Sequence, residues 1–379
     1  MRVTLVHSFY RSKYPSGENN AVRDQAQLLA EAGYEVTVVE RNSDKISRME
    51  KPLVAYNVAT FGGYDPFEEI TKTKPDLVHI HNLFPNFGSR WLKHISFPTV
   101  TTFHNFRPFC AAGTFMKDGK DCYICPESGS LAAIQSSCYQ GSSIASVPLS
   151  IATRNSGIHN PIFSSQTQSI VLSEYAKEMY LRYAPTGFAP HVVNNFAFRQ
   201  EAIKEVASDK NWVFVGRLSE EKGIEPLLES WPDGERIDVF GTGPLESDLR
   251  NKYKQRSHIR FRGLLEPKDR GKVLEESLGL LFPSTCRENS PLIVGEAYAA
   301  GLPIIAFAEN VVGAQIRVLG GGRTFEQFSE LSASINDLRA NMAVEITRVK
   351  QIYSSVYSPS VWLDKIKGIY DLAQKNKAG

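Results

Sequence analysis

Two glutamates near the C-terminal end of this chain offer the clearest chemistry. Glu288 and Glu296 have seven residues between them, and an apolar run at 278–282 predicts a buried strand just before the first of them. Ser290 followed by Pro291 is typical of a capped helix start, which places Glu296 on the second helical turn. Free backbone amides at a helix start favour an anion, and carboxylates accept hydrogen bonds from vicinal hydroxyls. The segment therefore predicts a binding site for a phosphorylated sugar.

Two cations follow the strand expected at 212–215. Arg217 and Lys222 stand in the loop after that strand. The carboxyl ends of strands in open α/β sheets face the ligand, so both side chains are expected to clamp a diphosphate. A solvated charged turn is the alternative, because Glu220 and Glu221 are immediate neighbours.

Three glycines are candidates for close backbone approach to the same ligand. Gly241 and Gly243 follow the strand expected at 237–240, and Gly17 lies between the first strand and the first helix. Tight-turn geometry explains all three equally well. The Gly-x-Gly-x-x-Gly fingerprint is absent, which weakens a nicotinamide dehydrogenase interpretation.

A histidine at the end of an N-terminal strand is a further candidate. His104 is expected to leave its strand toward the ligand and to donate a hydrogen bond to a sugar hydroxyl, whereas His79 alternates with apolar residues and is expected to be a core or edge histidine. The chain contains no Asp-x-Asp motif of the kind that binds a metal at other nucleotide-sugar sites. Catalysis is therefore expected to need no metal cofactor, and the leaving-group charge would fall to Arg217, Lys222 and the helix start.

Four of the five cysteines lie close together in sequence, within a loop-rich segment at about 105–145. They include one Cys-x-x-Cys pair, so a structural zinc site of four thiolates is one hypothesis, and free buried thiols in a loop are the other. The four candidate ligands are Cys110, Cys122, Cys125 and Cys138.

Composition limits the remaining possibilities. The 379 residues suggest two domains, and 43 basic against 41 acidic side chains argue against a nucleic-acid-binding protein. No apolar run approaches the roughly 18 residues of a membrane-spanning helix, so a cytoplasmic location is expected. Peripheral contact with the inner face of the cell membrane stays open.

Short apolar runs alternate with helical patterns in both halves, which predicts parallel sheets covered on both faces. The fold class is therefore α/β, with two Rossmann-like, doubly wound domains. We expect domains at residues 1–200 and 201–357, and a last helix at 358–379 that either packs on the second domain or crosses back to the first. The expected strands are 3–6, 36–39, 77–80, 99–102 and 170–172, then 212–215, 237–240, 259–261, 278–282 and 304–307.

Together these motifs resemble the retaining glycosyltransferases of the GT-B fold, family 4. The resemblance runs through nearly the whole chain, and the 288–296 segment is its most specific part. Two departures stand out, because Ser16-Gly17 replaces a paired glycine in the first loop and Asn194-Asn195 replaces an Asn-Gly pair near the hinge.

The resemblance implies roles for these residues on either side of an interdomain cleft. Glu296 would hold the nucleotide ribose and Glu288 would contact the transferred sugar. Arg217 and Lys222 would clamp the diphosphate, and His104 would line the donor sugar. The remaining donor contacts would come from the backbone near Gly17, Gly241, Gly243, Asn289, Ser290, Leu292 and Ile293.

The implied reaction moves a sugar from a UDP- or GDP-sugar to a hydroxyl of a glycan, a lipid-linked or a small-molecule acceptor, with retention at the anomeric carbon. Cell-envelope or surface polysaccharide synthesis is the setting that the resemblance favours. A sugar-nucleotide epimerase of the same fold and a non-catalytic sugar-nucleotide-binding subunit are the alternatives.

Overall fold

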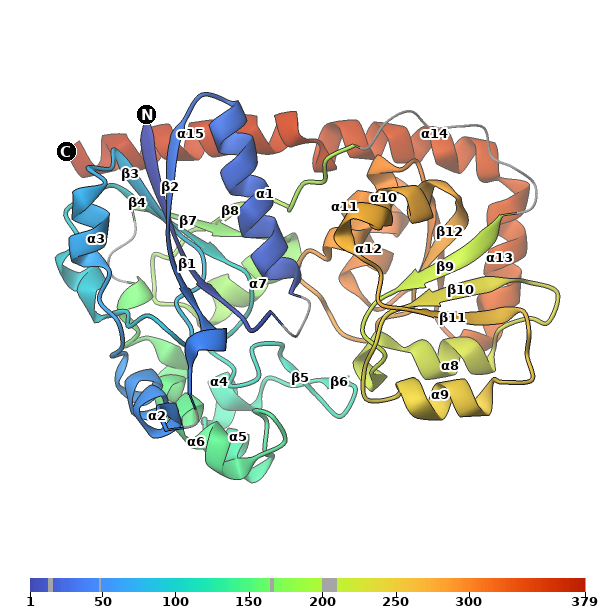
Figure 1. Ribbon diagram of the computed structural model, residues 1–379, viewed down its shortest axis with the longest axis horizontal. Coiled ribbons are helices and arrows are strands. Elements are labelled where there is room, and N and C mark those ends of the chain that lie inside the picture. The colour runs from blue at the N-terminus through green and yellow to red at the C-terminus, as the bar shows by residue number, and fades with distance from the viewer. Residues whose placement is uncertain (13–15, 48, 164–166, 200–209, 379) are drawn as a thin grey trace. The chain divides into compact units, whose positions relative to one another are not determined.

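The computed structural model describes residues 1–12, 16–47, 49–163, 167–199 and 210–378. The chain forms two compact units (Figure 1). The first consists of Met1–Lys117, Asp121–Asn194 and Trp362–Gly379, and the second of Asp118–Lys120 and Asn195–Val361. The boundary predicted at residue 200 falls in 200–209, outside the described residues, and the units divide between Asn194 and Asn195.

A parallel six-stranded sheet forms the centre of the first unit, in the order β2-β1-β3-β4-β7-β8. Its two central strands, at 77–80 and 99–103, are buried along their whole length, as expected for strands covered by helices on both faces. The strands are β1 (Arg2–Phe9), β2 (Glu35–Asn42), β3 (Leu77–Ile80), β4 (Thr99–Phe103), β7 (Gln168–Val171) and β8 (His191–Val192). A separate two-stranded ribbon consists of β5 (Met116–Lys117) and β6 (Lys120–Asp121).

The second unit repeats this plan with the order β11-β10-β9-β12-β13-β14, again all parallel. Every strand expected from the sequence overlaps an observed one, which confirms two Rossmann-like α/β domains. The short β8 and β14 were not expected. The strands are β9 (Asn211–Val215), β10 (Ile237–Phe240), β11 (Ile259–Gly263), β12 (Ser277–Phe282), β13 (Ile304–Phe307) and β14 (Gly322–Phe325).

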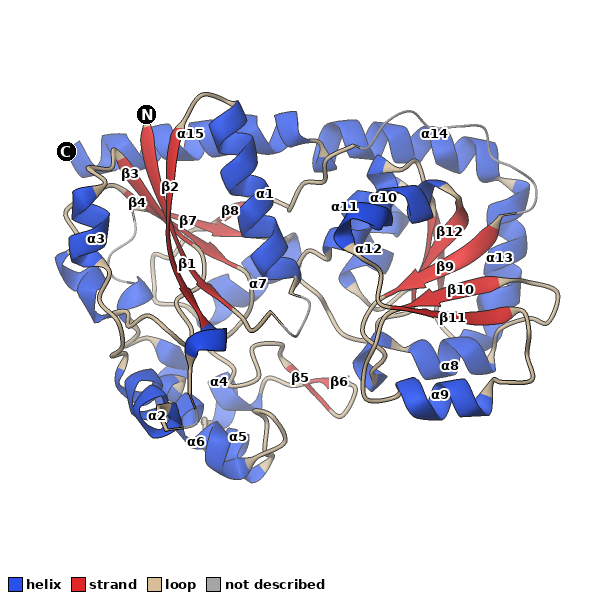
Figure 2. Ribbon diagram, in the orientation of Figure 1, coloured by secondary structure: helices blue, strands red, loops and turns tan. Residues whose placement is uncertain are grey.

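Helices surround each sheet (Figure 2). In the first unit they are α1 (Gly17–Glu31), α2 (Lys51–Thr60), α3 (Phe67–Lys72), α4 (Ile124–Ser128), α5 (Ala132–Gln135), α6 (Ser143–Ala152) and α7 (Glu174–Tyr183). In the second they are α8 (Ile224–Glu229), α9 (Glu246–Lys252), α10 (Pro267–Glu275), α11 (Leu292–Ala299), α12 (Val311–Leu319), α13 (Leu331–Ala340) and α14 (Met342–Ile352), and α15 (Pro359–Ala378) ends the chain.

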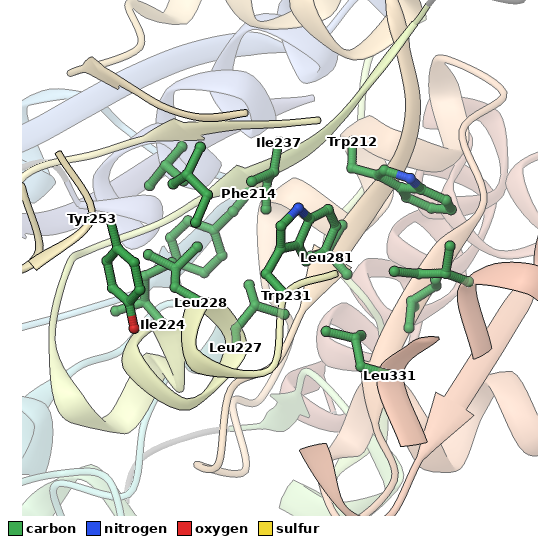
Figure 3. Close-up of a cluster of buried hydrophobic side chains, with 14 of the residues drawn as sticks. Trp212, Phe214, Ile224, Leu227, Leu228, Trp231, Ile237, Tyr253, Leu281 and Leu331 are labelled. Atoms are coloured by element: carbon green, nitrogen blue, oxygen red, sulfur yellow. The ribbon is translucent and has the colours of Figure 1, made fainter. Parts of the chain in front are cut away.

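Large side chains from helices and strands fill the core of the second unit (Figure 3). Trp212 of β9 and Trp231, just after α8, are at most 2% exposed, and Leu331 of α13 closes the same cluster. Burial of side chains of this size supplies most of the stabilising free energy of such a domain. The cluster holds β9 in position, and the two candidate cations, Arg217 and Lys222, follow the end of this strand.

One face of α15 packs into the first unit. Its Trp362, Ile366, Ile369 and Tyr370, which the sequence places on one face, are all at most 5% exposed. The Tyr370 hydroxyl lies 2.8 Å from Nδ1 of His79 in β3, and burial lowers the pKa of that histidine to about 3. His79 is therefore a neutral core histidine, and the chain returns from the second unit to the first. Among the described residues, no helix combines the length and apolar character needed to cross a bilayer.

Candidate functional site

The candidate residues of the second unit gather where its sheet changes direction. The chain leaves β9 toward β10 and β11, then crosses to β12 on the other side of β9. Loops that diverge in this way open a crevice at the carboxyl ends of the strands, which is where ligands bind in such folds. Lys222 lies in the loop after β9, and Glu288 and the start of α11 follow β12.

Lys222 and Glu288 form an ion pair across this point, with Nζ 2.7 Å from Oε1. Their side chains are 24% and 22% exposed, so the pair is shielded but still reachable. Burial alone would lower the pKa of Lys222, but the Glu288 carboxylate outweighs it, and the pKa is raised. Lys222 is therefore a permanent cation, as a diphosphate site requires.

Backbone contacts hold the two loops together. The carbonyl oxygen of Glu221 accepts hydrogen bonds from the Thr285 amide at 3.0 Å and from the Ser284 hydroxyl at 3.1 Å. Gly223 adopts φ +65°, and a Cβ there would lie 2.2 Å from the carbonyl oxygen of Pro283. The position of Lys222 is thus set by main-chain packing that only glycine permits at residue 223.

The helix start differs from the prediction. The helix begins at Leu292 with Pro291 as its N-cap, and no side chain in the described part of the chain caps it. Ser290, predicted as the cap, instead accepts a hydrogen bond from the Asn195 amide at 3.1 Å, because the extended Pro291 separates it from the first turn. The amides of this turn thus lack a side-chain acceptor, an arrangement that favours an anion.

Glu296 is paired with a residue that the sequence analysis missed. Nη1 of Arg270, on α10, lies 2.5 Å from Oε1 of Glu296. The two side chains are 19% and 24% exposed, so the arginine fixes one carboxylate oxygen at the edge of the site. The two residues are far apart in sequence, and only the packing of α10 on α11 pairs them. No local pattern could have indicated Arg270.

The two glycines after β10 have a packing role. A Cβ at Gly241 would lie 1.8 Å from the carbonyl oxygen of Gly216, and one at Gly243 would lie 2.3 Å from that of Leu218. Both glycines therefore let the loops after β9 and β10 touch. Arg217, which lies in the chain between Gly216 and Leu218, is exposed, and Asn289, Leu292 and Ile293 are partly exposed.

Two candidate residues lie in the first unit. Gly17 opens α1, whose cap is the Ser16 hydroxyl, accepting from the Asn19 amide at 3.3 Å. His104 follows β4, with Nε2 3.0 Å from Nδ1 of His81. Burial lowers the pKa of His104 to about 3, so its ring is neutral.

The structure does not support the zinc hypothesis. Among the described residues, no group of three or more His, Cys, Asp or Glu side chains is placed to hold a metal ion. Cys110 packs among aromatic side chains beside α7, whereas Cys125 packs in a different cluster with Ala133 and Leu149. Burial raises the pKa of Cys125 to about 12, which disfavours the thiolate. Cys122 and Cys138 form no disulfide bond with another described residue.

Two family models match the chain. Residues 15–195 match the model described as Glycosyltransferase Family 4, and residues 209–341 match the model described as Glycosyl transferases group 1. The first match lies in the first unit up to its boundary at Asn194–Asn195, and the second lies wholly in the second unit.

Solved structures share the architecture. A sucrose-phosphate synthase from Thermosynechococcus elongatus is similar over 98% of this chain and 98% of its own, with a TM-score of 0.67 and 17% sequence identity. HepE from Anabaena, in complex with UDP and glucose, is similar over 98% and 100%, with a TM-score of 0.59 and 16% identity. At these identities the likeness shows the GT-B fold.

A curated relative is similar over part of the sequence. Spore coat protein SA of Bacillus subtilis (strain 168) is 27% identical over 186 residues, which are 44% of this chain and 48% of that protein. The chain thus spans about half the length of this relative. The two family models and the fold identify the chain as a glycosyltransferase of the GT-B type, with a family 4 domain followed by a group 1 domain.

Proposed function

We propose that this protein transfers a sugar from a UDP- or GDP-sugar to a hydroxyl acceptor with retention at the anomeric carbon. The observation that carries the proposal is the Lys222–Glu288 pair beside the uncapped start of α11, at the point where the second sheet changes direction. A fixed cation and free helix amides stabilise the charge that develops on a departing diphosphate.

The other residues would divide the donor between them. Glu296, oriented by Arg270, would bind the ribose hydroxyls, and Glu288 would contact the transferred sugar. Arg217 would add a second cation at the diphosphate. A role for His104 at the donor sugar follows from the family resemblance alone. HepE, which shares the fold, was solved with UDP-glucose, which makes UDP-glucose the first donor to try.

The reaction would need no protein nucleophile. In a front-face mechanism the acceptor oxygen bonds to the anomeric carbon on the face from which the phosphate leaves. The bond from that carbon to the phosphate oxygen breaks, and this oxygen accepts the proton of the acceptor hydroxyl. Lys222 and the α11 amides would hold the phosphate in place during this exchange. We place the reaction in cell-envelope or surface polysaccharide synthesis, with a glycan, lipid-linked or small-molecule acceptor.

Nucleotide binding tests the proposal directly. We expect UDP or GDP to raise the melting temperature of the protein, and uridine or guanosine to have little effect, because the nucleosides lack the diphosphate. At a ligand concentration of 100 times Kd the added stability is about 2.7 kcal/mol, which thermal denaturation resolves easily. Absence of any shift with both nucleotides at millimolar concentration would contradict the proposal.

Incubation with UDP-glucose separates the alternatives. Isomerised UDP-sugar in the absence of acceptor would indicate the epimerase. Binding without hydrolysis, isomerisation or transfer to any acceptor would indicate the non-catalytic subunit.

Replacing Glu296 should weaken nucleotide binding. In Glu296→Gln the carboxylate that would accept from the ribose loses its charge, and hydrogen bonds to charged groups contribute about 1.5–3 kcal/mol. We expect the Kd for UDP to rise at least about tenfold, measured by titration calorimetry. Glu266→Gln, at the exposed start of α10, is the matched control and should bind as the wild type does. Equal affinity in both variants would exclude Glu296 from the site.

A further inference from the structure

The first unit contains a cavity of about 120 Å³. It lies at the carboxyl ends of β3 and β4 and beside the start of α1, and every residue that lines it belongs to this unit. The sheet changes direction between β1 and β3, so the cavity occupies the position where ligands bind in such folds. Of the candidate donor residues, only His104 lines it.

One end of the cavity carries buried charges with unused hydrogen-bonding capacity. Oε2 of Glu18 accepts from the Asn105 amide group at 3.3 Å, but Oε1 is buried and has no hydrogen-bond partner among the described residues. Arg107 donates from Nη1 to the Ala111 carbonyl at 3.0 Å, while its buried Nε also has no partner there. Buried polar atoms of this kind are costly unless a ligand or water satisfies them.

The pKa of the Glu18 carboxyl also lies close to physiological pH. Burial raises its pKa to about 7, although the Arg107 charge and the Asn105 hydrogen bond act in the opposite direction. Such a group can accept a hydrogen bond from a ligand hydroxyl when ionised and donate one when protonated. A hydroxyl-bearing ligand group therefore suits this end of the cavity.

The rest of the cavity wall is largely apolar. Phe61, at the end of α2, and Leu149, on α6, face it together with Phe84 and Ile162. The Arg107 guanidinium lies over the Phe84 ring, 4.3 Å from its centroid, and so marks where the polar end meets the apolar wall. For comparison, a dry apolar cavity of about 150 Å³ holds benzene. A free sugar would leave the hydroxyls that face these apolar side chains unpaired.

The two helices that line the cavity also expose apolar side chains. α2 and α6 pack against one another (Figure 1). Residues 129–153, which include α6, contain no charged side chain, although 22% of the whole chain is charged. The exposed side chains are Leu53 (59%), Tyr56 (64%), Ile144 (86%) and Ile151 (50%). The two helices thus both line the cavity and expose apolar side chains.

We propose that this cavity binds the acceptor, and that the acceptor is an amphiphile whose hydroxyl-bearing head meets Glu18 and Arg107 while its apolar body lies along α2 and α6. The inference rests on the proposed glycosyl transfer and names the chemical class of its acceptor. A lipid-linked glycan and a soluble glycoside with an apolar aglycone share this chemistry.

Octyl β-D-glucoside below its micellar concentration tests the proposal against methyl β-D-glucoside, which has the same head. We expect the full-length protein to bind the octyl compound at least about tenfold more tightly in titration calorimetry, because the alkyl chain leaves water. Equal affinity for the two glucosides, or no binding of either, would overturn the proposal.

Two variants locate the site. Ala152→Phe places a ring in the cavity and should abolish the preference for the octyl compound, whereas Leu181→Ala, at an exposed position on α7 of the same unit, should keep it. Glu18→Gln keeps the shape and should weaken binding of both glucosides several-fold, which tests the head group even if Ala152→Phe does not fold. An octyl preference that persists in Ala152→Phe, with unchanged affinities in Glu18→Gln, would place the binding elsewhere.

Two further readouts complete the test. Binding of UDP and of GDP to each variant reports on the donor site separately. A wild-type protein that binds neither nucleotide would contradict the proposed function, whereas the comparison of the two glucosides tests the cavity. Flotation with phosphatidylglycerol vesicles distinguishes the sources: an octyl preference with flotation indicates a membrane lipid acceptor, and one without flotation indicates a soluble glycoside.

Discussion

Lys222→Ala is expected to lower the rate of glycosyl transfer by about a hundred- to a thousandfold, the loss seen when one preorganised group that stabilises transition-state charge is removed. The Lys222 ammonium is held 2.7 Å from Glu288 beside the start of α11, where a departing diphosphate would gain charge. The effect should appear mainly in kcat, because the charge grows as the bond to the sugar breaks. Initial rates with UDP-glucose as donor measure it.

A control variant must separate the effect of removing the Lys222 charge from an effect of Lys222→Ala on folding. Lys268→Ala removes an exposed lysine of α10 in the same unit and should leave transfer unchanged. Because the Lys222–Glu288 pair is partly exposed, its removal should change the free energy of unfolding by only about 1 kcal/mol. A Lys222→Ala protein that melts like the wild type and transfers at the wild-type rate would remove this residue from the proposed mechanism.

Glu345→Ala should lower the free energy of unfolding by about 3 kcal/mol, the cost of breaking a buried ion network. The Glu345 side chain is fully buried and accepts from the amides of Gly321 and Gly322 at 2.8 and 3.1 Å. It also pairs with Arg323 at 2.6 Å and Arg348 at 2.7 Å. Truncation would leave the two buried amides without this acceptor, and it would remove the acidic partner of Arg348 and one of the two acidic partners of Arg323. Urea denaturation measures the loss.

The same network predicts a pH dependence. Burial alone would raise the pKa of Glu345, but the bonds from Arg323 and Gly321 outweigh it, so the folded-state pKa is below the ordinary value of 4.5. Its contribution to stability is therefore complete above about pH 4.5 and is lost as the pH falls through the folded-state pKa. Glu326→Ala, at an exposed position nearby, should change stability by less than about 0.5 kcal/mol at any pH. Equal losses of stability in the two variants would show that the Glu345 network does not stabilise the second unit.

The strands were readable because their apolar runs are short, local and bounded by turn residues. Leu77–Ile80, Ile237–Phe240 and Ile304–Phe307 begin and end where the sequence predicted them. β8, with two residues, carries too little pattern to be distinguished from a loop. The alternation of strands and helices predicts that each sheet is parallel. It does not predict the order of the strands, because many orders fit the same alternation.

Two predictions made from residue type and spacing were wrong because residues distant in sequence determine the contacts of the side chains concerned. Ser290 fits a cap by type, but Asn195, distant in sequence, takes its hydroxyl. The four cysteines have a ligand-like spacing, yet Cys110 packs in one apolar cluster and Cys125 packs in another. In both cases tertiary packing determines which groups the side chain contacts, and these contacts cannot be predicted from spacing along the chain.

By itself, the sequence determined the α/β class, the two Rossmann-like domains, nearly all the strands, and the placement of Arg217, Lys222, Glu288 and Glu296 after strands or on a helix of the second domain. These properties depend on periodicity and on residues within a few positions of each other. Only the tertiary structure decided that Arg270 holds Glu296, that α15 packs into the first unit through Tyr370, and that Glu18 and Arg107 meet at one cavity. Each of these joins groups that are remote in sequence, and the packing of the surrounding side chains brings them together.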